Sequence, residues 1–501
     1  MTARTLMIQG ASSSVGKSLL VTALCRIFAR RGVKVAPFKA QNMSNNAAVC
    51  PDGSEIGRAQ ALQAHAAGVA LSSDLNPILI KPEADAHSQI IVDGRPFKSL
   101  SAYGYYQYKQ ILWGHATTAL DRLRLQNDLV IIEGAGSPAE LNLKRGDIVN
   151  MAIARYANSP VILAGDIDRG GIFAQLLGTL WLLEPEERQL VRGFLVNKFR
   201  GDIHLFEDGV RILEEKSELP VLGVIPYLKD LNLPEEDAVA LDGQDEALHN
   251  DALIDIVVIH LPVISNFDDF DPFRADADVR VRYVTHASEV GQPHAIILPG
   301  TKSTIADLTW LRERGFDRVI REHVQRGGSV IGICGGYQML GRMIHDPEHV
   351  ESPKDQIDGL GLLLTETFFI PEKATYQVHA QVTGRTAWLA SLAECELQGY
   401  EIHMGRTDSA STWLEIDTRN GTPCNLADGS MSSDGRIWGC YLHGLFGNTA
   451  FRHAWLTSLG WKPGSQSINP QAELEASLDH LADEVEAVID IHEIERMIWA
   501  D

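Results

Sequence analysis

The sequence predicts an α/β protein made of two doubly wound domains, and three observations favour this fold class. A short apolar run near the N-terminus ends in a glycine- and serine-rich loop that closes with Gly-Lys-Ser. In the second half, the β-branched run at 329–333 leads into a turn that holds a cysteine, and then into a helix-compatible run. Elsewhere, strand-like apolar runs alternate with helical periodicity, which is typical of mostly parallel sheets.

An acidic stretch without strand-like runs separates the two halves. It lies between Pro226 and Ala252 and is rich in Asp and Glu, as expected of a linker. We therefore predict four segments: a P-loop domain at 1–228, an acidic linker at 229–252, a second domain at 253–464 and a C-terminal helical tail at 465–501. We assign no chemistry to the tail.

The N-terminal strand–loop–helix stretch predicts a nucleotide site. The loop has five residues between Gly10 and Gly16, whereas the common P-loop pattern has four. Its context is nevertheless that of a P-loop, in which backbone N–H groups wrap the phosphates. Lys17 would neutralise the outer phosphates of ATP and the Ser18 hydroxyl would reach Mg²⁺. We expect the ATP site to include a loop serine, Ser14, as well.

The second predicted strand is followed by a run with many amide side chains, Lys39 to Asn46. Such a run is also compatible with a solvated turn. However, Lys39 follows the carboxyl end of a strand beside the phosphate loop, where α/β proteins form ligand sites. A lysine there could bridge the γ-phosphate and an incoming carboxylate, so we predict a catalytic role for Lys39.

Carboxylates and an amide follow other strands of the first domain. Glu133 ends an apolar run and is placed to hold Mg²⁺, although an acid at a strand end can also be merely solvated. Asp166 and Asp168 repeat this pattern, and Asn197 is placed to contact the nucleotide base. We also include Glu55, which precedes an alanine-rich helix, among the candidate metal ligands.

The cysteine turn in the second half predicts a nucleophile. Cys334 lies between a strand and a helix with glycines around it, and a nucleophile elbow needs such glycines because its backbone is strained. The amino end of the following helix favours a thiolate. Backbone N–H groups of Gly335 and Gly300 could form an oxyanion hole. The alternative is a buried, inert cysteine.

A cysteine nucleophile needs a base, which is usually a histidine distant in sequence. His443 follows an apolar run and precedes a glycine, so we predict that it is this base. His403 is the second candidate. Each histidine could instead be structural.

The composition excludes several classes of partner. Lys+Arg number 44 and Asp+Glu 66, a net charge of −22, which argues against binding nucleic acid or an anionic membrane. The six cysteines contain no CxxC pair, so neither a disulfide framework nor a zinc site is predicted, and a reduced, cytoplasmic protein is favoured. We find neither a signal peptide nor an apolar run of membrane-spanning length. We expect small-molecule partners, and a homo-oligomer stays open.

Several of these motifs resemble known families. Gly332-Ile-Cys334-Gly-Gly-Tyr-Gln338 resembles the class I glutamine amidotransferase motif, and the N-terminal half resembles the dethiobiotin-synthetase-like P-loop group. Together with Pro37 to Asn46, Gly399-Tyr-Glu-Ile-His-Met-Gly405 and Tyr441-Leu-His-Gly444, the combination resembles the cobyric acid synthase family. The resemblance extends over nearly the whole chain, and the amide-rich run is its most specific part.

The resemblance implies a reaction and its partners. A side-chain carboxylate of adenosylcobyrinic acid a,c-diamide would be phosphorylated by ATP and amidated by ammonia, at the b, d, e and g positions. Cys334 would form a glutamyl thioester and Gln338 would help to hold glutamine. Contacts to the corrinoid are expected from polar side chains of the N-terminal domain: Gln41, Asn42, Asn45, Asn46, Arg58 and Lys81.

One position departs from the wider amidotransferase pattern. Many class I enzymes place a glutamate two residues after the histidine, where this chain has Leu445. We therefore expect a Cys–His dyad, or a third residue supplied from elsewhere, for which Glu401 is a candidate. A dyad is chemically adequate, because a thiolate paired with His443 is already a strong nucleophile.

Two alternatives share parts of this pattern. The sister enzyme that amidates the a and c carboxylates of the same macrocycle would have both sites, and only the N-terminal loops argue against it. A P-loop partitioning or regulatory ATPase with an inert elbow domain is the alternative of another class. Such a protein usually needs an amphipathic membrane segment or a partner surface, and an intact Cys334 and His443 also argue against it.

Overall fold

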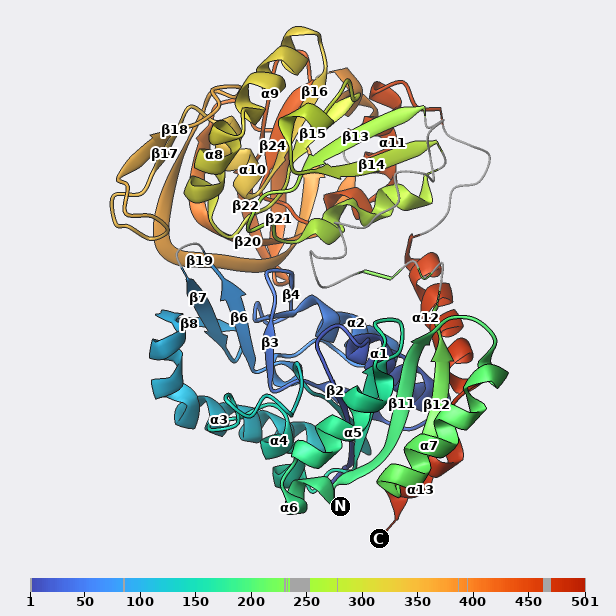
Figure 1. Cartoon of the computed structure of the whole chain (residues 1–501). Coiled ribbons are helices and arrows are strands. Elements are labelled where there is room, and N and C mark those ends of the chain that lie inside the picture. The colour runs from blue at the N-terminus through green and yellow to red at the C-terminus, as the bar shows by residue number, and fades with distance from the viewer. Residues whose placement is uncertain are drawn as a thin grey trace.

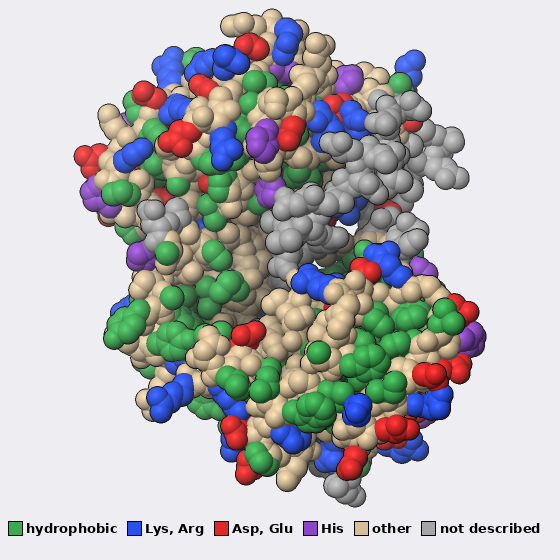
Figure 2. Space-filling view, viewed as in Figure 1, with side chains coloured by type: hydrophobic (Ala, Val, Ile, Leu, Met, Phe, Trp, Pro, Cys, Tyr) green, Lys and Arg blue, Asp and Glu red, His purple; other side chains and the backbone are tan. Residues whose placement is uncertain are grey.

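The computed structural model describes most of the chain and shows two lobes that meet at a waist (Figures 1 and 2). The described residues are 2–83, 86–228, 231, 233–234, 253–276, 278–385, 387–393, 395–462 and 470–500. The acidic linker predicted at 229–252 therefore lies almost wholly outside them. Within the described residues, no helix is both long enough and apolar enough to cross a membrane.

The lower lobe in Figure 1 is built around a six-stranded parallel sheet with the order β12-β11-β10-β1-β9-β2. The strands are β1 (Arg4–Gly10), β2 (Val35–Phe38), β9 (Leu129–Glu133), β10 (Val161–Asp166), β11 (Val191–Phe199) and β12 (Val221–Pro226). Their apolar runs are buried on both faces, as expected for a parallel sheet covered by helices. The helices are α1 (Lys17–Arg30), α2 (Arg58–Ala67), α3 (Ala102–Gln126), α4 (Met151–Ala157), α5 (Ile172–Leu182), α6 (Pro185–Arg188) and α7 (Glu207–Ser217).

The amide-rich run is more regular than a loop. Part of it forms β3 (Gln41–Met43), which pairs with β6 (Ile78–Pro82) in a small sheet that continues into β7 (His87–Val92) and β8 (Arg95–Ser101). After a turn, β4 (Ala47–Val49) and β5 (Glu55–Gly57) form a hairpin. These short elements lie at the edge of the lobe that faces the second lobe (Figure 1).

The upper lobe contains the second predicted sheet, with the order β14-β13-β15-β16-β24-β23. Only β23 runs antiparallel to its neighbour. The strands are β13 (Ile254–Ile259), β14 (Val279–Val284), β15 (Ala295–Leu298), β16 (Ser329–Ile333), β23 (Ser430–Met431) and β24 (Ile437–Cys440). The helices of this lobe are α8 (Thr304–Glu313), α9 (Phe316–Gln325), α10 (Gly335–Leu340) and α11 (Thr449–Ser458).

A largely antiparallel sheet extends the upper lobe beyond the doubly wound pattern. Its order is β18-β17-β19-β21-β22, with β20 on the other edge of β19. The strands are β17 (Met343–His345), β18 (Gln356–Asp358), β19 (Thr365–Val382), β20 (Glu396–Ser409), β21 (Leu414–Arg419) and β22 (Thr422–Asp428). The long β19 and β20 run along the waist between the lobes (Figure 1), so they place residues of the upper lobe against the lower one.

The C-terminal tail returns to the first domain. Its helices α12 (Pro470–Glu486) and α13 (Ile491–Trp499) pack beside the lower lobe (Figure 1). Leu478 and Leu481 are fully buried in the core that α1 forms with the central sheet. Arg26 of α1 pairs with Asp479 at 2.8 Å. The tail therefore completes the core of the N-terminal domain, a contact that its charged helical pattern did not predict.

Candidate active site

The phosphate loop lies between β1 and α1, as the sequence predicts. Gly16 precedes the helix with φ 96°, a conformation that side chains other than glycine rarely adopt. A Cβ atom added to Gly16 would also lie 2.4 Å from the amide nitrogen of Asn197. That amide donates to the carbonyl of Val15 at 2.7 Å. Asn197 thus braces the loop, besides lining the cavity beside it.

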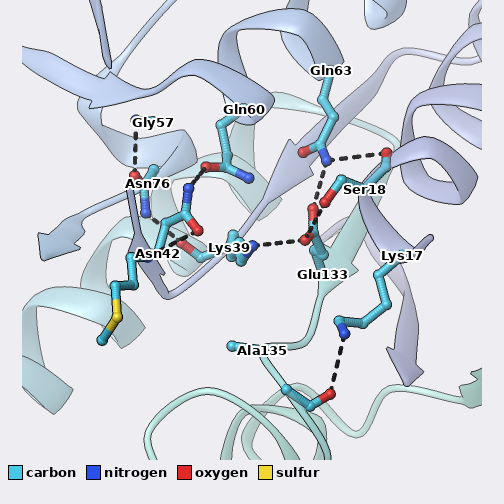
Figure 3. A network of polar contacts seen from close by, with 12 residues as sticks. Lys17, Ser18, Lys39, Asn42, Gly57, Gln60, Gln63, Asn76, Glu133 and Ala135 are labelled. Carbon is cyan, nitrogen blue, oxygen red and sulfur yellow. Dashed lines mark hydrogen bonds and ion pairs between the residues drawn. The ribbon is translucent and has the colours of Figure 1, made fainter. Parts of the chain in front are cut away.

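A buried carboxylate network adjoins this loop (Figure 3). Glu133, at the end of β9, is 1% exposed. Its Oε1 accepts hydrogen bonds from the Ser18 hydroxyl at 2.9 Å and from the Lys39 ammonium at 2.7 Å, and Gln63 of α2 donates to Oε2 at 2.6 Å. Burial by itself would raise the pKa of Glu133, but Lys39, Gln63 and Ser18 together hold it below its usual value. Glu133 is therefore ionised.

The donor set fits a small hard cation. A hydroxyl and a carboxylate oxygen, 2.9 Å apart at the start of α1, are the oxygen ligands that Mg²⁺ prefers. Lys17 extends over the loop toward the carbonyl of Gly136 at 3.1 Å (Figure 3), and it also reaches the carbonyl of Ser12 at 3.3 Å. The predicted phosphate-loop lysine, serine and strand-end acid are thus brought to one place.

A cavity of about 1230 Å³ opens beside this network. Its lining combines the phosphate loop with polar side chains of β3 and apolar side chains of the tail: Ser14, Gly16, Lys17, Ser18, Lys39, Gln41, Asn42, Glu133, Asn197, Leu481 and Val485. Asn42 donates to Gln60 of α2 at 2.9 Å and Gln41 bonds to Tyr105. The volume exceeds that of most small-molecule pockets, so a nucleotide and a large second substrate could both fit.

Six residues predicted for the N-terminal site are not among those that line this cavity: Gly10, Asn45, Asn46, Glu55, Arg58 and Lys81. Asn45 and Asn46 lie on the turn between β3 and β4. Glu55 bonds to Lys81 and lies 2.6 Å from Lys373 of the upper lobe. Burial would raise the pKa of Glu55, but the two lysines lower it to about 2. Glu55 is thus held at the waist by two lysines. It does not lie in the Ser18–Glu133 network, where it was predicted to be a magnesium ligand.

Arg58 also faces the upper lobe. Its guanidinium lies 3.0 Å from the carboxylate of Asp268 and 2.6 Å from the hydroxyl of Tyr400. The predicted contact between Arg58 and corrinoid carboxylates is therefore replaced by a contact between the two domains.

The cysteine turn has the strained geometry of a nucleophile elbow. β16 ends at Ile333, and Cys334 has φ 50° and ψ −109° before α10 begins. A Cβ atom on Gly336 would lie 1.9 Å from the carbonyl oxygen of Leu298, and one on Gly332 would lie 2.6 Å from that of Gly336. Only glycine fits at these two positions, because the helix turns directly back over the strands. The strain is carried by the cysteine itself.

His443 and Asp269 complete the site at this turn. The Cys334 sulfur is close enough to the His443 ring to contribute to its raised pKa, and the thiol donates to the carbonyl of Ile402 at 3.5 Å. On the other side of the ring, Nδ1 lies 2.7 Å from Asp269, whose second oxygen accepts from the backbone N–H of Gly444, also at 2.7 Å. Burial would lower the pKa of His443, but the Asp269 carboxylate and the Cys334 sulfur raise it to about 10. The imidazole is therefore held in its charged form.

Of the two alternatives, a dyad or a third residue supplied from elsewhere, the geometry favours the second, and the third residue is Asp269 rather than Glu401. Glu401 forms ion pairs with Arg419 at 2.8 Å and with His403 at 3.3 Å. Asp269 lies 174 residues before His443 in the sequence, on the 3₁₀ segment Phe267–Ala275. The only sequence signal was the five-residue stretch Asp268 to Pro272, which contains three aspartates. Nothing in that stretch singled out one aspartate as the partner of the histidine.

A smaller cavity lies beside the cysteine, and its lining includes Cys334, Gln338, Thr304 and Lys302. Gln338 is fixed inside by Thr304, which donates to it at 2.9 Å, and by the Tyr441 hydroxyl at 3.2 Å. A Cβ on Gly335 would lie 2.7 Å from the Thr301 side chain. The loop after β15 is thus packed against the elbow, which places Gly300 and Gly335 on neighbouring segments.

Two family descriptions match the two halves of the chain. Residues 6–239 match the CobQ/CobB/MinD/ParA nucleotide binding domain, and residues 255–451 match the CobB/CobQ-like glutamine amidotransferase domain. Together with the sites described above, they define the class: a P-loop protein joined to a glutamine amidotransferase.

Full-length relatives narrow the class to one family. The chain is 56% identical to a cobyric acid synthase of Roseiflexus castenholzii, with 98% of each chain covered. It is 56% identical to one of Chloroflexus aurantiacus, over 96% of this chain and 97% of that one, and 50% identical to one of Dehalococcoides mccartyi, over 98% of each. The chain belongs to the cobyric acid synthase family, whose members are glutamine-dependent, ATP-using ligases of cobalamin biosynthesis.

Proposed function

We propose that the chain converts adenosylcobyrinic acid a,c-diamide to adenosylcobyric acid by amidating the b, d, e and g carboxylates in turn. The observation that carries this proposal is the presence on one chain of two sites with complementary chemistry. One is the Ser18–Glu133–Lys39 network beside a large cavity, and the other is the Cys334–His443–Asp269 arrangement. The first activates a carboxylate and the second supplies ammonia.

The amidotransferase site acts through the thiolate of Cys334. The thiolate attacks the side-chain carboxamide carbon of glutamine, and backbone N–H groups of Gly335 and Gly300 hold the oxygen that becomes negative. The C–N bond breaks as the His443 imidazolium gives its proton to the departing ammonia. Water then cleaves the thioester and releases glutamate. Asp269 holds the ring in the orientation and charge state that these steps need.

The P-loop site uses charge rather than a covalent nucleophile. Lys17 and the loop N–H groups bind the phosphates of ATP, and Mg²⁺ held by Ser18 and Glu133 would offset the charge that develops during transfer. Lys39 binds Glu133 at 2.7 Å and lines the cavity, so it can pair with the corrinoid carboxylate. The carboxylate displaces ADP from the γ-phosphate, and ammonia then displaces phosphate to leave the amide.

The corrinoid is assigned to the cavity on the side of β3. Gln41 and Asn42 line it and can hydrogen-bond to the peripheral amides of the macrocycle. We assign ligation to residues 1–228 and glutamine hydrolysis to residues 253–464. The tail helices supply part of the cavity wall through Leu481 and Val485.

The test counts the amides that the enzyme adds. Adenosylcobyrinic acid a,c-diamide is incubated with ATP, Mg²⁺ and glutamine, and the product is analysed by mass spectrometry. Four additions support the proposal. A starting corrinoid that carries neither amide, converted only as far as two additions at a and c, would instead identify the sister activity. No addition to either substrate would overturn the assignment of the acceptor.

A further inference from the structure

One helix of the P-loop domain touches the machinery of both sites. In the middle of α2, Gln63 donates to Glu133 at 2.6 Å, and in the first turn Gln60 accepts from Asn42 at 2.9 Å (Figure 3). Arg58 is the first residue of the same helix. It reaches across the waist to the upper lobe, where it lies 3.0 Å from Asp268. A rigid helix of ten residues thus joins the two centres.

Arg58 meets the amidotransferase site at two points. Asp268 directly precedes Asp269, the carboxylate that lies 2.7 Å from His443. Arg58 also donates to the hydroxyl of Tyr400 at 2.6 Å, and the Tyr400 ring is stacked on the His443 ring with centroids 5.2 Å apart. The backbones of Tyr400 and His443 exchange two hydrogen bonds, at 3.1 and 2.9 Å. The arginine therefore contacts Tyr400, which is stacked on the histidine ring, and Asp268, the residue next to the histidine's carboxylate partner.

The Arg58–Asp268 ion pair is largely buried, so its loss is expected to cost more than the loss of an ion pair on the surface. The Arg58 side chain is 19% exposed and that of Asp268 is 13% exposed, so the pair is largely removed from water. Burial raises the pKa of Asp268, Arg58 opposes that rise, and the neighbouring Asp269 adds to it. Without the arginine, the carboxylates of Asp268 and Asp269 would share a buried site with only one positive charge, the His443 imidazolium. Because this excess negative charge is unfavourable, Asp268 would move or take up a proton.

We propose that Arg58 of the P-loop domain is a positioning residue for glutamine hydrolysis, holding Asp269 and His443 in place through Asp268 and Tyr400. Glutamine is then hydrolysed efficiently only when α2 is docked against the upper lobe. Because the same helix contacts Glu133, the ligase domain sets the activity of the ammonia-producing domain. This inference rests on the proposed function of the Cys334 site, but not on the identity of the acceptor.

The test separates hydrolysis from ligation. Arg58→Met keeps the length of the side chain and removes its charge and its hydrogen bonds. We expect kcat for glutamine hydrolysis to fall about 30-fold with KM changed less than about 3-fold, because a misplaced catalytic group costs rate rather than binding. Synthesis driven by ammonium should stay within about 2-fold of wild type, since it bypasses this site. Arg58→Lys, which retains the charge, should recover part of the loss.

The matched control is Gln377→Ala. Gln377 donates to the carbonyl of Val49 across the same waist at 2.8 Å. Its backbone is opposite Tyr400 in the β19–β20 ladder, but among the described residues its side chain hydrogen-bonds to neither Asp268 nor Tyr400. The control should keep wild-type hydrolysis. Tyr400→Phe, which loses only the hydroxyl that Arg58 contacts, should show a smaller loss, about 3-fold.

Chemical alkylation of Cys334 reports on the amidotransferase site directly. The rate at which iodoacetamide alkylates Cys334, followed by mass spectrometry of its peptide across pH 5–10, measures the thiolate. The charged and titratable groups around His443 are Cys334, Asp268, Asp269, Tyr400 and Arg58. In Arg58→Met the profile should move to higher pH, because the imidazolium that stabilises the thiolate is less well held.

Three results would overturn the inference. They are unchanged hydrolysis in Arg58→Met, equal losses of glutamine-driven and ammonium-driven synthesis, and a loss in Gln377→Ala as large as that in Arg58→Met. A failure of the proposed function would be recognised separately. In that case the single variant Cys334→Ala, with Arg58 intact, would still hydrolyse glutamine.

Discussion

The phosphate loop and the cysteine elbow have the same order of elements, strand, glycine-containing turn and helix, but they present opposite parts of the chain. At the phosphate loop the positive φ of 96° falls on Gly16, and the backbone N–H groups face the ligand. At the elbow the positive φ of 50° falls on Cys334, and a side chain is the reactive group. In the first turn Gly16 shares the left-handed conformation with Ser14, whose φ is 57°, whereas glycines around the second turn make room for a strained cysteine.

The difference extends to the acids beside the two turns. Glu133 belongs to a strand next to the phosphate loop in the same sheet, so its position follows from the sheet order. Asp269 comes from a 3₁₀ segment outside any strand and reaches His443 from 174 residues away. One site is built mainly from the ends of neighbouring strands, and the other depends on a connection packed over its sheet.

The largest effect is expected from a substitution that disrupts the phosphate loop. Lys17→Ala should lower synthesis about 10³-fold with glutamine and with ammonium alike, because both need the γ-phosphate to be held and neutralised. Glutamine hydrolysis without ATP should stay within about 3-fold of wild type. Corrinoid amidation and glutamate release are measured in parallel. Full ammonium-driven synthesis in this variant would contradict the role of the loop.

The matching change at the elbow separates the two sites. Cys334→Ala should lose glutamine-driven synthesis by about 10³-fold or more, since no other group forms the thioester. Synthesis with ammonium should persist, because the P-loop site is intact. Labelled ammonium, followed into the corrinoid by mass spectrometry, checks the second half of this prediction. A variant that still used glutamine would show that the elbow is not the nucleophile.

A smaller effect tests the third residue. Asp269→Asn keeps the shape of the side chain but removes the charge that faces His443. We expect glutamine hydrolysis to fall about 10²-fold or more, as for other catalytic histidines that lose their acid. Glu401→Gln is the control and should have little effect on kcat. If Glu401→Gln had the larger effect, the original choice of acid would be restored.

The smallest expected effect is on stability. The pKa of His443 is raised from 6.5 to about 10 in the folded protein, so the folded state binds its proton more tightly than the unfolded state does. The stabilisation is complete below about pH 6.5 and is lost as pH rises toward 10. The thermal midpoint of the upper lobe should therefore fall more between pH 7 and pH 10 in wild type than in Asp269→Asn. Equal falls would show that the pair does not stabilise the fold.

Much of the architecture was predictable because its signals are local. A tight strand-to-helix turn needs glycine at particular positions, as at Gly332 and Gly336, where a Cβ atom would meet backbone. Buried parallel strands need apolar runs. These requirements act on residues that are close in sequence, so they leave patterns of residue type, and both strand-to-helix turns could be located from them.

The remaining features depend on contacts between distant segments. The sequence by itself determined the two-domain α/β fold, and it located the phosphate loop, Cys334 and His443 as candidates. Only the tertiary structure decided that Asp269 rather than Glu401 contacts His443, that Arg58 faces Asp268 rather than the large cavity, and that the tail packs on α1. When a side chain contacts a partner on another element, the contact leaves no periodicity or regular spacing in the sequence. The role of such a side chain is set by how the elements pack, because packing determines which charges are buried together.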